Sequence, residues 1–239
     1  MRFLFICLPL VMWGQDKPKL FVYVPSTIRP AIFEKQLQKD CPDLRVTLYN
    51  HHRPLIKAVS RSVPAAIISL ETVVSQQRFS MFDRALEGIR DGKDWEQYLL
   101  LSKRSGVLQL PVIRVGVVAI LNRKQMLATL TAMFDDRGAL DYVPVTKVPD
   151  LLALLQVDQA DGIMVRQEYA QTYFQNHTEM DLVSYVLPKA KLGLPVMIIS
   201  KEISPKTRKL IIDSIQGLDQ EMNLKLRVDS WTEYAVSPK

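Results

Sequence analysis

The feature of the sequence that most constrains the fold is the stretch of residues 19–37, KLFVYVPSTIRPAIFEKQL. It opens with an apolar run over residues 20–24 that is rich in β-branched and aromatic side chains and is too short for a helix. Such a run predicts a strand that is buried on both faces. Pro25 ends the run, and Ser26 and Thr27 supply the hydroxyl groups that are favoured at the start of a helix. The stretch therefore predicts a strand, a turn and a helix.

The turn at Ser26 and Thr27 is a candidate ligand site. A helix N-terminus leaves backbone N–H groups without partners, and the helix dipole favours negative charge there. We therefore expect these two residues to contact a small ligand. The alternative is that Thr27 only caps its helix.

Two further strands are predicted at residues 44–49 and 65–70, with a helix between them. Strands and helices that alternate at this spacing predict parallel strands joined by right-handed crossovers. Ligands of such sheets bind beyond the carboxyl ends of the strands. The candidate contacts at these ends are Arg53, Ser69, Glu71 and Thr72.

These candidates differ in the chemistry that they offer. Arg53 can form a bidentate pair with a carboxylate or a phosphate, with an exposed surface arginine as the alternative. Ser69 and Thr72 would supply hydroxyl groups to a second wall of the site. Glu71 would bind an amine and oppose an anion, so both kinds of ligand stay open.

The rest of the chain repeats the alternation of strands and helices. We expect residues 73–97 to be largely helical, residues 112–121 to be a long strand, and residues 194–200 to be a strand that returns to the first sheet. The expected fold class is α/β with two lobes, each a mainly parallel sheet flanked by helices, and a cleft between them. The expected domains are a signal peptide at 1–14, the first lobe at 15–110, the second lobe at 111–187, and a return strand with C-terminal helices at 188–239.

The first fourteen residues differ from the rest of the chain. Arg2 precedes an uninterrupted apolar stretch over residues 3–13, which is shorter than the about 20 residues needed to span a bilayer. This pattern is typical of a secretory signal peptide, with a buried N-terminal strand as the alternative. We therefore expect an exported, periplasmic protein in which Cys41 is the one remaining cysteine and forms no internal disulfide.

Charge and motifs argue against several other functions. The net charge of +6 suits an anionic partner, but no block of basic residues predicts binding to nucleic acid. His51 and His52 are adjacent, so their side chains diverge, and we expect no metal site and no cofactor. The sequence contains no nucleophile elbow, phosphate-binding loop or zinc-protease motif, so we expect no catalytic residues and no enzyme.

Four local phrases and the order of the elements resemble one family. The phrases are VYVPS at 22–26, AIISLETV at 66–73, RVGVV at 114–118 and VTKVPDLL at 145–152. Over most of residues 19–235 the chain resembles the periplasmic solute-binding proteins of the phosphonate/phosphite ABC-transporter class. The resemblance implies the type II periplasmic-binding-protein fold and a phosphate- or phosphonate-like anion as ligand.

The chain departs from this class at the predicted start of the second lobe's first helix. Members of the class typically have a Ser-Thr-rich turn there, whereas this chain has AILNRK at residues 119–124. Asn122 and Arg123 are the candidate ligand contacts at this place. Arg166 and Gln167, which follow the strand at 162–165, are candidate contacts from across the cleft, with a solvated strand end as the alternative.

Two functions follow from these patterns. The first is an exported solute-binding protein that closes on a small anionic or zwitterionic ligand, with a hinge near residues 110–117 and 188–195. A membrane permease or a sensor protein would then recognise the closed form. The alternative is a ligand-free binding-protein fold that acts as an accessory or sensory interaction module of a cell-envelope complex.

Overall fold

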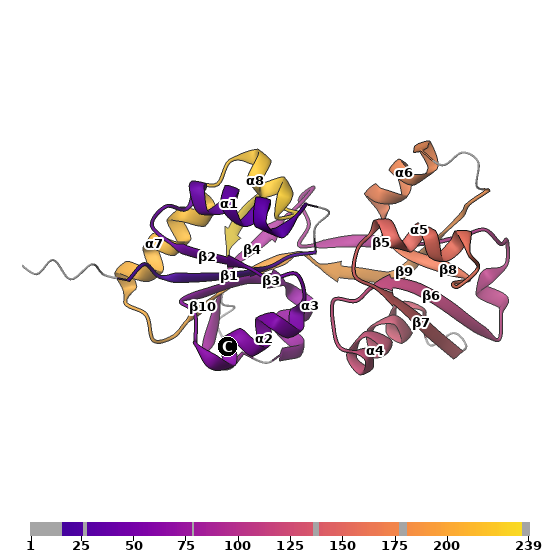
Figure 1. Ribbon diagram of the computed structural model, residues 1–239, viewed down its shortest axis with the longest axis horizontal. Coiled ribbons are helices and arrows are strands. Elements are labelled where there is room, and N and C mark those ends of the chain that lie inside the picture. The colour runs from indigo at the N-terminus through magenta and orange to yellow at the C-terminus, as the bar shows by residue number, and fades with distance from the viewer. Residues whose placement is uncertain (1–15, 26–27, 78, 136–138, 177–180, 236–239) are drawn as a thin grey trace, which may run out of the picture.

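The computed structural model describes residues 16–25, 28–77, 79–135, 139–176 and 181–235. Within these ranges the chain forms two lobes, each built on one β-sheet with helices packed against it (Figure 1). The predicted two-lobed α/β fold is therefore confirmed, and both sheets are mixed. The predicted signal peptide at 1–14 lies outside the described residues.

The sheet of the first lobe has the strand order β11-β4-β10-β3-β1-β2. Strand β1 pairs in parallel with β2 and β3, as the alternation of strands and helices predicts, whereas β10 runs antiparallel to β3 and β4. The strands are β1 (Lys19–Tyr23), β2 (Arg45–Leu48), β3 (Ala66–Leu70), β4 (Phe82–Ile89), β10 (Pro195–Ser200) and β11 (Ser230–Glu233).

Helices cover both faces of this sheet (Figure 1). Leu20 and Val22 of β1 face one side, where they pack with Phe33 and Leu37 of the first helix. Phe21 faces the other side and packs with Leu55. Both faces of β1 are thus buried, which explains its continuous apolar run. The helices of this lobe are α1 (Pro30–Asp40), α2 (His52–Arg61), α3 (Glu71–Gln77), α7 (Pro205–Gln216) and α8 (Gln220–Lys225).

The sheet of the second lobe has the strand order β7-β6-β8-β5-β9. Its strands are β5 (Trp95–Ser102), β6 (Val112–Val118), β7 (Ala139–Val145), β8 (Gly162–Arg166) and β9 (Val183–Gly193). Its helices are α4 (Arg123–Met133), α5 (Pro149–Gln156) and α6 (Gln167–Asn176), and a short 3₁₀ helix spans Val107–Gln109. The carboxyl ends of the parallel strands β6 and β8 point toward the first lobe.

The chain passes between the sheets at two adjacent places. The first is the turn at residues 90–94 between β4 and β5, where Arg90 and Lys93 exchange two backbone hydrogen bonds of 2.9 Å. The second is at Gly193, which pairs with Trp95 of β5. The first passage therefore precedes β5, whereas the sequence placed it near residue 110.

The expected helix over residues 73–97 is wrong after Gln77. Strand β4 fills residues 82–89 and lies between β10 and β11. Gly88 shows why this strand depends on tertiary packing, because a Cβ atom there would lie 2.7 Å from the carbonyl oxygen of Pro195 and 2.3 Å from Val228. The neighbouring backbone, which is distant in sequence, selects the strand over the local helical pattern.

In the part of the chain that is described, no helix is both long enough and apolar enough to cross a membrane.

Candidate functional site

A cavity of about 350 Å³ lies between the two lobes, and we call it the interlobe cavity. The first lobe contributes the end of β1, the start of α1 and the loop before α2. The second lobe contributes the end of β6 and the loop before α5. The first lobe's lining residues are Tyr23, Val24, Pro25, Ile28, Arg29, Pro30, Leu48, Tyr49, Asn50 and His51, and the second lobe's are Val118, Ala119, Thr146, Lys147, Val148 and Pro149.

Three of the described helices begin at this cavity. Helix α1 begins after Arg29, α2 after His51 and α5 after Val148. Helices α1 and α2 have no acidic residue in the first turn and no side-chain hydrogen bond at the cap. Their positive dipole ends are therefore not neutralised by their own sequence, which favours an anion at this place.

The charged side chains around the cavity have the same sign. Arg29 lies on the first lobe and Lys147 on the second, and none of the lining residues is a carboxylate. Tyr49, Asn50 and Thr146 add neutral hydrogen-bonding groups. The described lining residues thus offer donors and positive charge from both lobes and no carboxylate, and the acidic residue at the helix starts is Asp150 in the first turn of α5.

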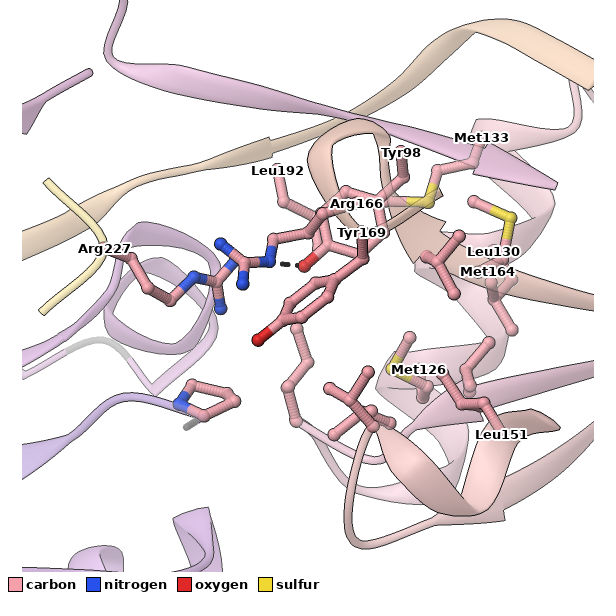
Figure 2. A pocket seen from close by; sticks show the side chains of 16 residues that line it. Tyr98, Met126, Leu130, Met133, Leu151, Met164, Arg166, Tyr169, Leu192 and Arg227 are labelled. Atoms are coloured by element: carbon pink, nitrogen blue, oxygen red, sulfur yellow. Dashed lines mark hydrogen bonds between the residues drawn. The ribbon is translucent and has the colours of Figure 1, made fainter. Parts of the chain in front are cut away.

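A second, smaller cavity of about 50 Å³ adjoins the first, and we call it the methionine pocket. Pro25, Val118 and Val148 line both cavities. The inner wall of the pocket is apolar and comes from the second lobe (Figure 2). This wall includes Met126, Leu130, Met133, Leu151 and Met164.

Polar side chains line the part of the pocket that faces the first lobe. Arg166 ends β8, and Arg227 follows α8 of the first lobe, so one guanidinium comes from each lobe. Figure 2 shows the two guanidiniums next to each other, with the methionines deeper in the second lobe. Both arginines are ion-paired with Glu96 of β5. The side chains of Arg166, Arg227 and Glu96 are 14%, 6% and 11% exposed.

Some of the N–H donors of the Arg227 guanidinium have hydrogen-bond acceptors, and one has none among the described residues. Its Nη2 atom donates to the hydroxyl of Tyr98 at 3.1 Å, but its buried Nε atom has no hydrogen-bond partner within the described residues. Burial, assisted by the charge of Arg90, lowers the pKa of Arg227 to about 9. Burial also raises the pKa of Tyr98 to about 12. A charged group is therefore held in a poorly solvated place at the lobe interface.

The predicted contacts Ser26, Thr27 and Arg53 of the first lobe are not among the described residues that line the interlobe cavity. Ser26 and Thr27 lie outside the described residues, and their neighbours in sequence, Pro25 and Ile28, line the cavity. Arg53 is exposed on the first turn of α2 and is not among the lining residues, whereas its neighbours Asn50 and His51 are.

The three predicted contacts after β3 also fall away from both cavities. Ser69 is fully buried within the sheet, between Tyr23 and Val196, and its hydroxyl has no hydrogen-bond partner in the described part of the chain. Glu71 is bound to Arg84 at 2.6 Å and to Ser75. Thr72 follows it on α3. Neither Ser69, Glu71 nor Thr72 lines the interlobe cavity or the methionine pocket.

Of the predicted contacts of the second lobe, one lines a cavity and the other three do not. Asn122 caps α4, since its side-chain oxygen accepts a hydrogen bond of 3.0 Å from the backbone N–H of Gln125. Arg123 is exposed and lies over the ring of Tyr142. Gln167 is exposed at the start of α6. Among the predicted contacts that the structure describes, only Arg166 lines one of the two cavities.

Sequence reasoning missed several residues of the site. Arg29 stands directly before the proline that begins α1, and Lys147 stands two positions before the proline that begins α5, so the start signals of these helices could have identified both residues. Arg227 and Glu96 carry no such pattern. They lie 131 positions apart in sequence (227 − 96) and meet only because the chain returns to the first lobe.

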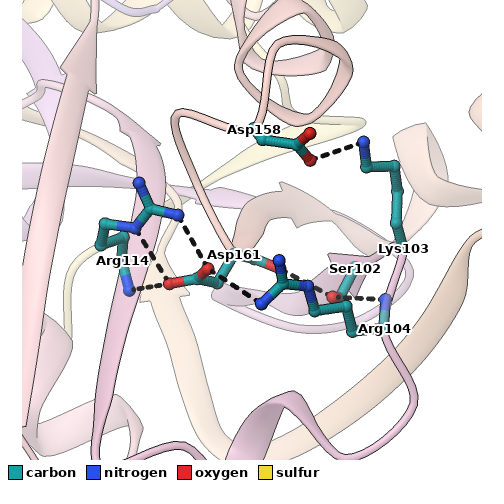
Figure 3. A network of polar contacts seen from close by, with 6 residues as sticks. All are labelled: Ser102, Lys103, Arg104, Arg114, Asp158 and Asp161. Carbon is teal, nitrogen blue, oxygen red and sulfur yellow. Dashed lines mark hydrogen bonds and ion pairs between the residues drawn. The ribbon is translucent and has the colours of Figure 1, made fainter.

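A separate polar network lies at the end of the second lobe that is distant from the first lobe (Figure 3). The Asp161 carboxylate accepts hydrogen bonds from the backbone N–H, Nε and Nη2 of Arg114 at 2.9–3.2 Å. Ser102 donates to the backbone oxygen of Asp161 at 2.7 Å, and Lys103 is ion-paired with Asp158 at 2.7 Å. These contacts tie the ends of β5, β6 and β8 together, so the network stabilises the lobe.

No group of three or more His, Cys, Asp or Glu residues in the described ranges is placed to hold a metal ion.

Comparison with known proteins finds similarity at the level of structure. No protein-family model matches the chain, and no curated protein matches its sequence. Among solved structures, a binding protein component of an ABC phosphonate transporter (PA3383) from Pseudomonas aeruginosa has a TM-score of 0.63 at 9% identity, covering 92% of this chain and 82% of that one. XAC2383 from Xanthomonas citri, bound to ATP, has a TM-score of 0.60 at 12% identity and covers 92% of both chains.

A third similar structure comes from a different kind of system. The periplasmic VFT2 domain of BvgS from Bordetella pertussis has a TM-score of 0.53 at 11% identity, covering 88% of this chain and 92% of that one. At these identities the similarity concerns the arrangement of the two lobes.

Proposed function

We propose that this chain, which has the two-lobed type II fold of periplasmic binding proteins, is a solute-binding protein that closes on a small anion. The observation that carries the proposal is the interlobe cavity, which is lined by Arg29, Lys147 and three helix N-termini and by no carboxylate. Positive charge from both lobes converges there.

The charge around the cavity favours an anion over a zwitterion. A bound ammonium group would need a carboxylate or several carbonyl acceptors, and the lining side chains provide no carboxylate. Phosphonates, phosphate, sulfate and carboxylates all carry the negative charge that helix N-termini and Arg29 attract. The neighbours PA3383 and XAC2383, described as a phosphonate-transporter component and as bound to ATP, support this class of ligand.

Closure would couple binding to a change in shape. A ligand that contacts both lobes binds the closed form better than the open form and shifts the population toward it. The two adjacent passages at residues 90–94 and at Gly193 are the proposed hinge. A membrane permease or a sensor protein would recognise the closed form, and export to the periplasm is part of this proposal.

A thermal-shift titration with phosphate, methylphosphonate, sulfate and glutamate at constant ionic strength tests the function. A true ligand raises the melting temperature in a saturable way, because it binds the folded state only. We expect Lys147→Gln to weaken binding at least about tenfold, in the range of a lost charge-assisted hydrogen bond. Lys206→Gln, which removes an exposed charge on α7, is the matched control and should leave the affinity unchanged.

The contrary result is also informative. If no anion in the panel stabilises the protein at millimolar concentration, the solute-binding proposal is wrong. The ligand-free interaction module of a cell-envelope complex then becomes the better description.

A further inference from the structure

We propose that the methionine pocket binds an apolar arm of the ligand, so that the solute is an anion that carries a short alkyl or thioether group. This inference rests on the proposed function, because it specifies the ligand of the same site. It assigns the anionic group to the charged surfaces between the lobes and the apolar arm to the second lobe.

The pocket adjoins the interlobe cavity and is not an isolated void. Pro25, Val118 and Val148 form walls of both spaces, so one molecule can extend from the larger cavity into the smaller one. Pro25 and Arg227 belong to the first lobe, whereas the inner wall belongs to the second. A packing defect inside one lobe would be lined by that lobe alone. This pocket instead meets the interface that lobe movement would open.

The chemistry of the inner wall selects an apolar group. Met126, Met133 and Met164 line it together with leucines, and no charged side chain reaches this wall among the described residues (Figure 2). Apolar cavities of this kind stay dry and bind apolar molecules. Methionine side chains are flexible and polarisable, so they adapt to alkyl and thioether groups.

The charges beside the pocket add to the positive charge that the interlobe cavity offers to the anionic group. The guanidiniums of Arg166 and Arg227 share the carboxylate of Glu96, and Arg166 is also 3.6 Å from the exposed carboxylate of Glu168. A buried charge without full compensation is costly, and the Nε atom of Arg227 is a buried donor without a hydrogen-bond partner in the described chain. An anionic group of the ligand next to the apolar arm would accept a hydrogen bond from this Nε atom.

The size of the pocket limits the length of the arm. Its volume is about 50 Å³. Since about 10–15 Å³ of such space is enough to hold one water molecule, this pocket holds a group of on the order of two or three carbon atoms. An ethyl, propyl or methylthio group fits, whereas an octyl chain does not.

The test is a titration of wild-type protein with two homologous series, the n-alkylphosphonates and the n-alkanoates, from one to eight carbons. We expect the dissociation constant to fall about fourfold for each added methylene up to about three carbons, the gain typical of a buried CH₂ group. For longer chains the dissociation constant should level off or rise. If the shortest members bind and lengthening brings no gain, the inference is wrong while the proposed function stands. If no member of either series binds, the inference is wrong, and the proposed function is wrong as well if phosphate and sulfate also fail to bind.

Filling the pocket provides a second, independent measurement. Met164→Phe should remove the gain with chain length and keep the affinity for the one-carbon anion within about twofold. Met81→Phe adds the same bulk at a methionine that is 43% exposed, and it should keep the wild-type dependence on chain length. If Met164→Phe retains the full gain with chain length, the arm does not enter this pocket.

Discussion

The guanidinium of Arg227, which follows the last helix of the first lobe, is ion-paired with the carboxylate of Glu96 in the strand that begins the second lobe. Both side chains are nearly fully buried. Glu96 is also within 3.6 Å of Arg166, so one carboxylate serves two arginines from different lobes. This relationship couples the charge of the proposed site to the junction between the lobes.

We expect Glu96→Gln to destabilise the protein by about 3 kcal/mol, because it leaves two buried guanidiniums without their shared carboxylate. Urea unfolding monitored by circular dichroism measures this change. Asp213→Asn is the control, since Asp213 is 57% exposed and is ion-paired with Lys209, which is 78% exposed. It should cost less than about 1 kcal/mol. If the two variants lose the same free energy of unfolding, Glu96 does not have the stabilising role described here.

Asp161 should contribute a pH-dependent part of the stability. Its hydrogen bonds from Arg114 hold the pKa of this carboxyl below its usual value, against the opposing effect of burial. A carboxyl with a depressed pKa in the folded state stabilises the protein above its unfolded pKa of about 4, and this stability is lost as the pH falls through the folded value. The free energy of unfolding measured between pH 2 and pH 7 should therefore fall more steeply at the acid end for wild type than for Asp161→Asn.

A matched control for this experiment is Asp158→Asn, at a side chain that is 66% exposed. This variant should keep most of the acid dependence of the wild type, because exposed ion pairs contribute little. If both variants have the same pH profile as the wild type, Asp161 does not act as described.

Gly88→Ala should destabilise the first lobe by about 2 kcal/mol, the range expected when a methyl group is forced into a packed core. The added Cβ atom would meet the carbonyl oxygen of Pro195 and a methyl group of Val228. Thermal unfolding measures the loss. Gly92→Asn is the comparison, because that position has open space and a φ of +71° that asparagine tolerates. A cost at Gly88 no larger than at Gly92 would contradict the close packing.

The variant Asn122→Ala should show whether Asn122 stabilises helix α4 or contacts the ligand. Asn122 caps α4, so its loss should cost about 1 kcal/mol of stability and leave anion affinity unchanged. Arg123→Gln, at a side chain that is 80% exposed, should change neither quantity. Stability comes from denaturant unfolding and affinity from titration calorimetry. A fall of tenfold or more in affinity for Asn122→Ala would return this residue to the ligand site.

Part of the fold could be predicted because its determinants are local. The apolar runs of β1 and β3 are buried on both faces, and a continuous run of that kind identifies an interior strand without knowledge of its partners. The alternation of these strands with helices then predicts parallel pairing. Arg166 could be named for the same reason, because it directly follows a short buried strand.

The sequence by itself determined the α/β class and the two cycles of strands and helices. Only the tertiary structure decided that residues 82–89 are a strand, that β5 belongs to the second sheet, and that Arg227 reaches Glu96. The physical reason is that these features depend on residues that are far apart in the sequence. Periodicity reports which face of a segment is buried, whereas sheet partners, cavities and buried ion pairs depend on contacts between segments that no local pattern encodes.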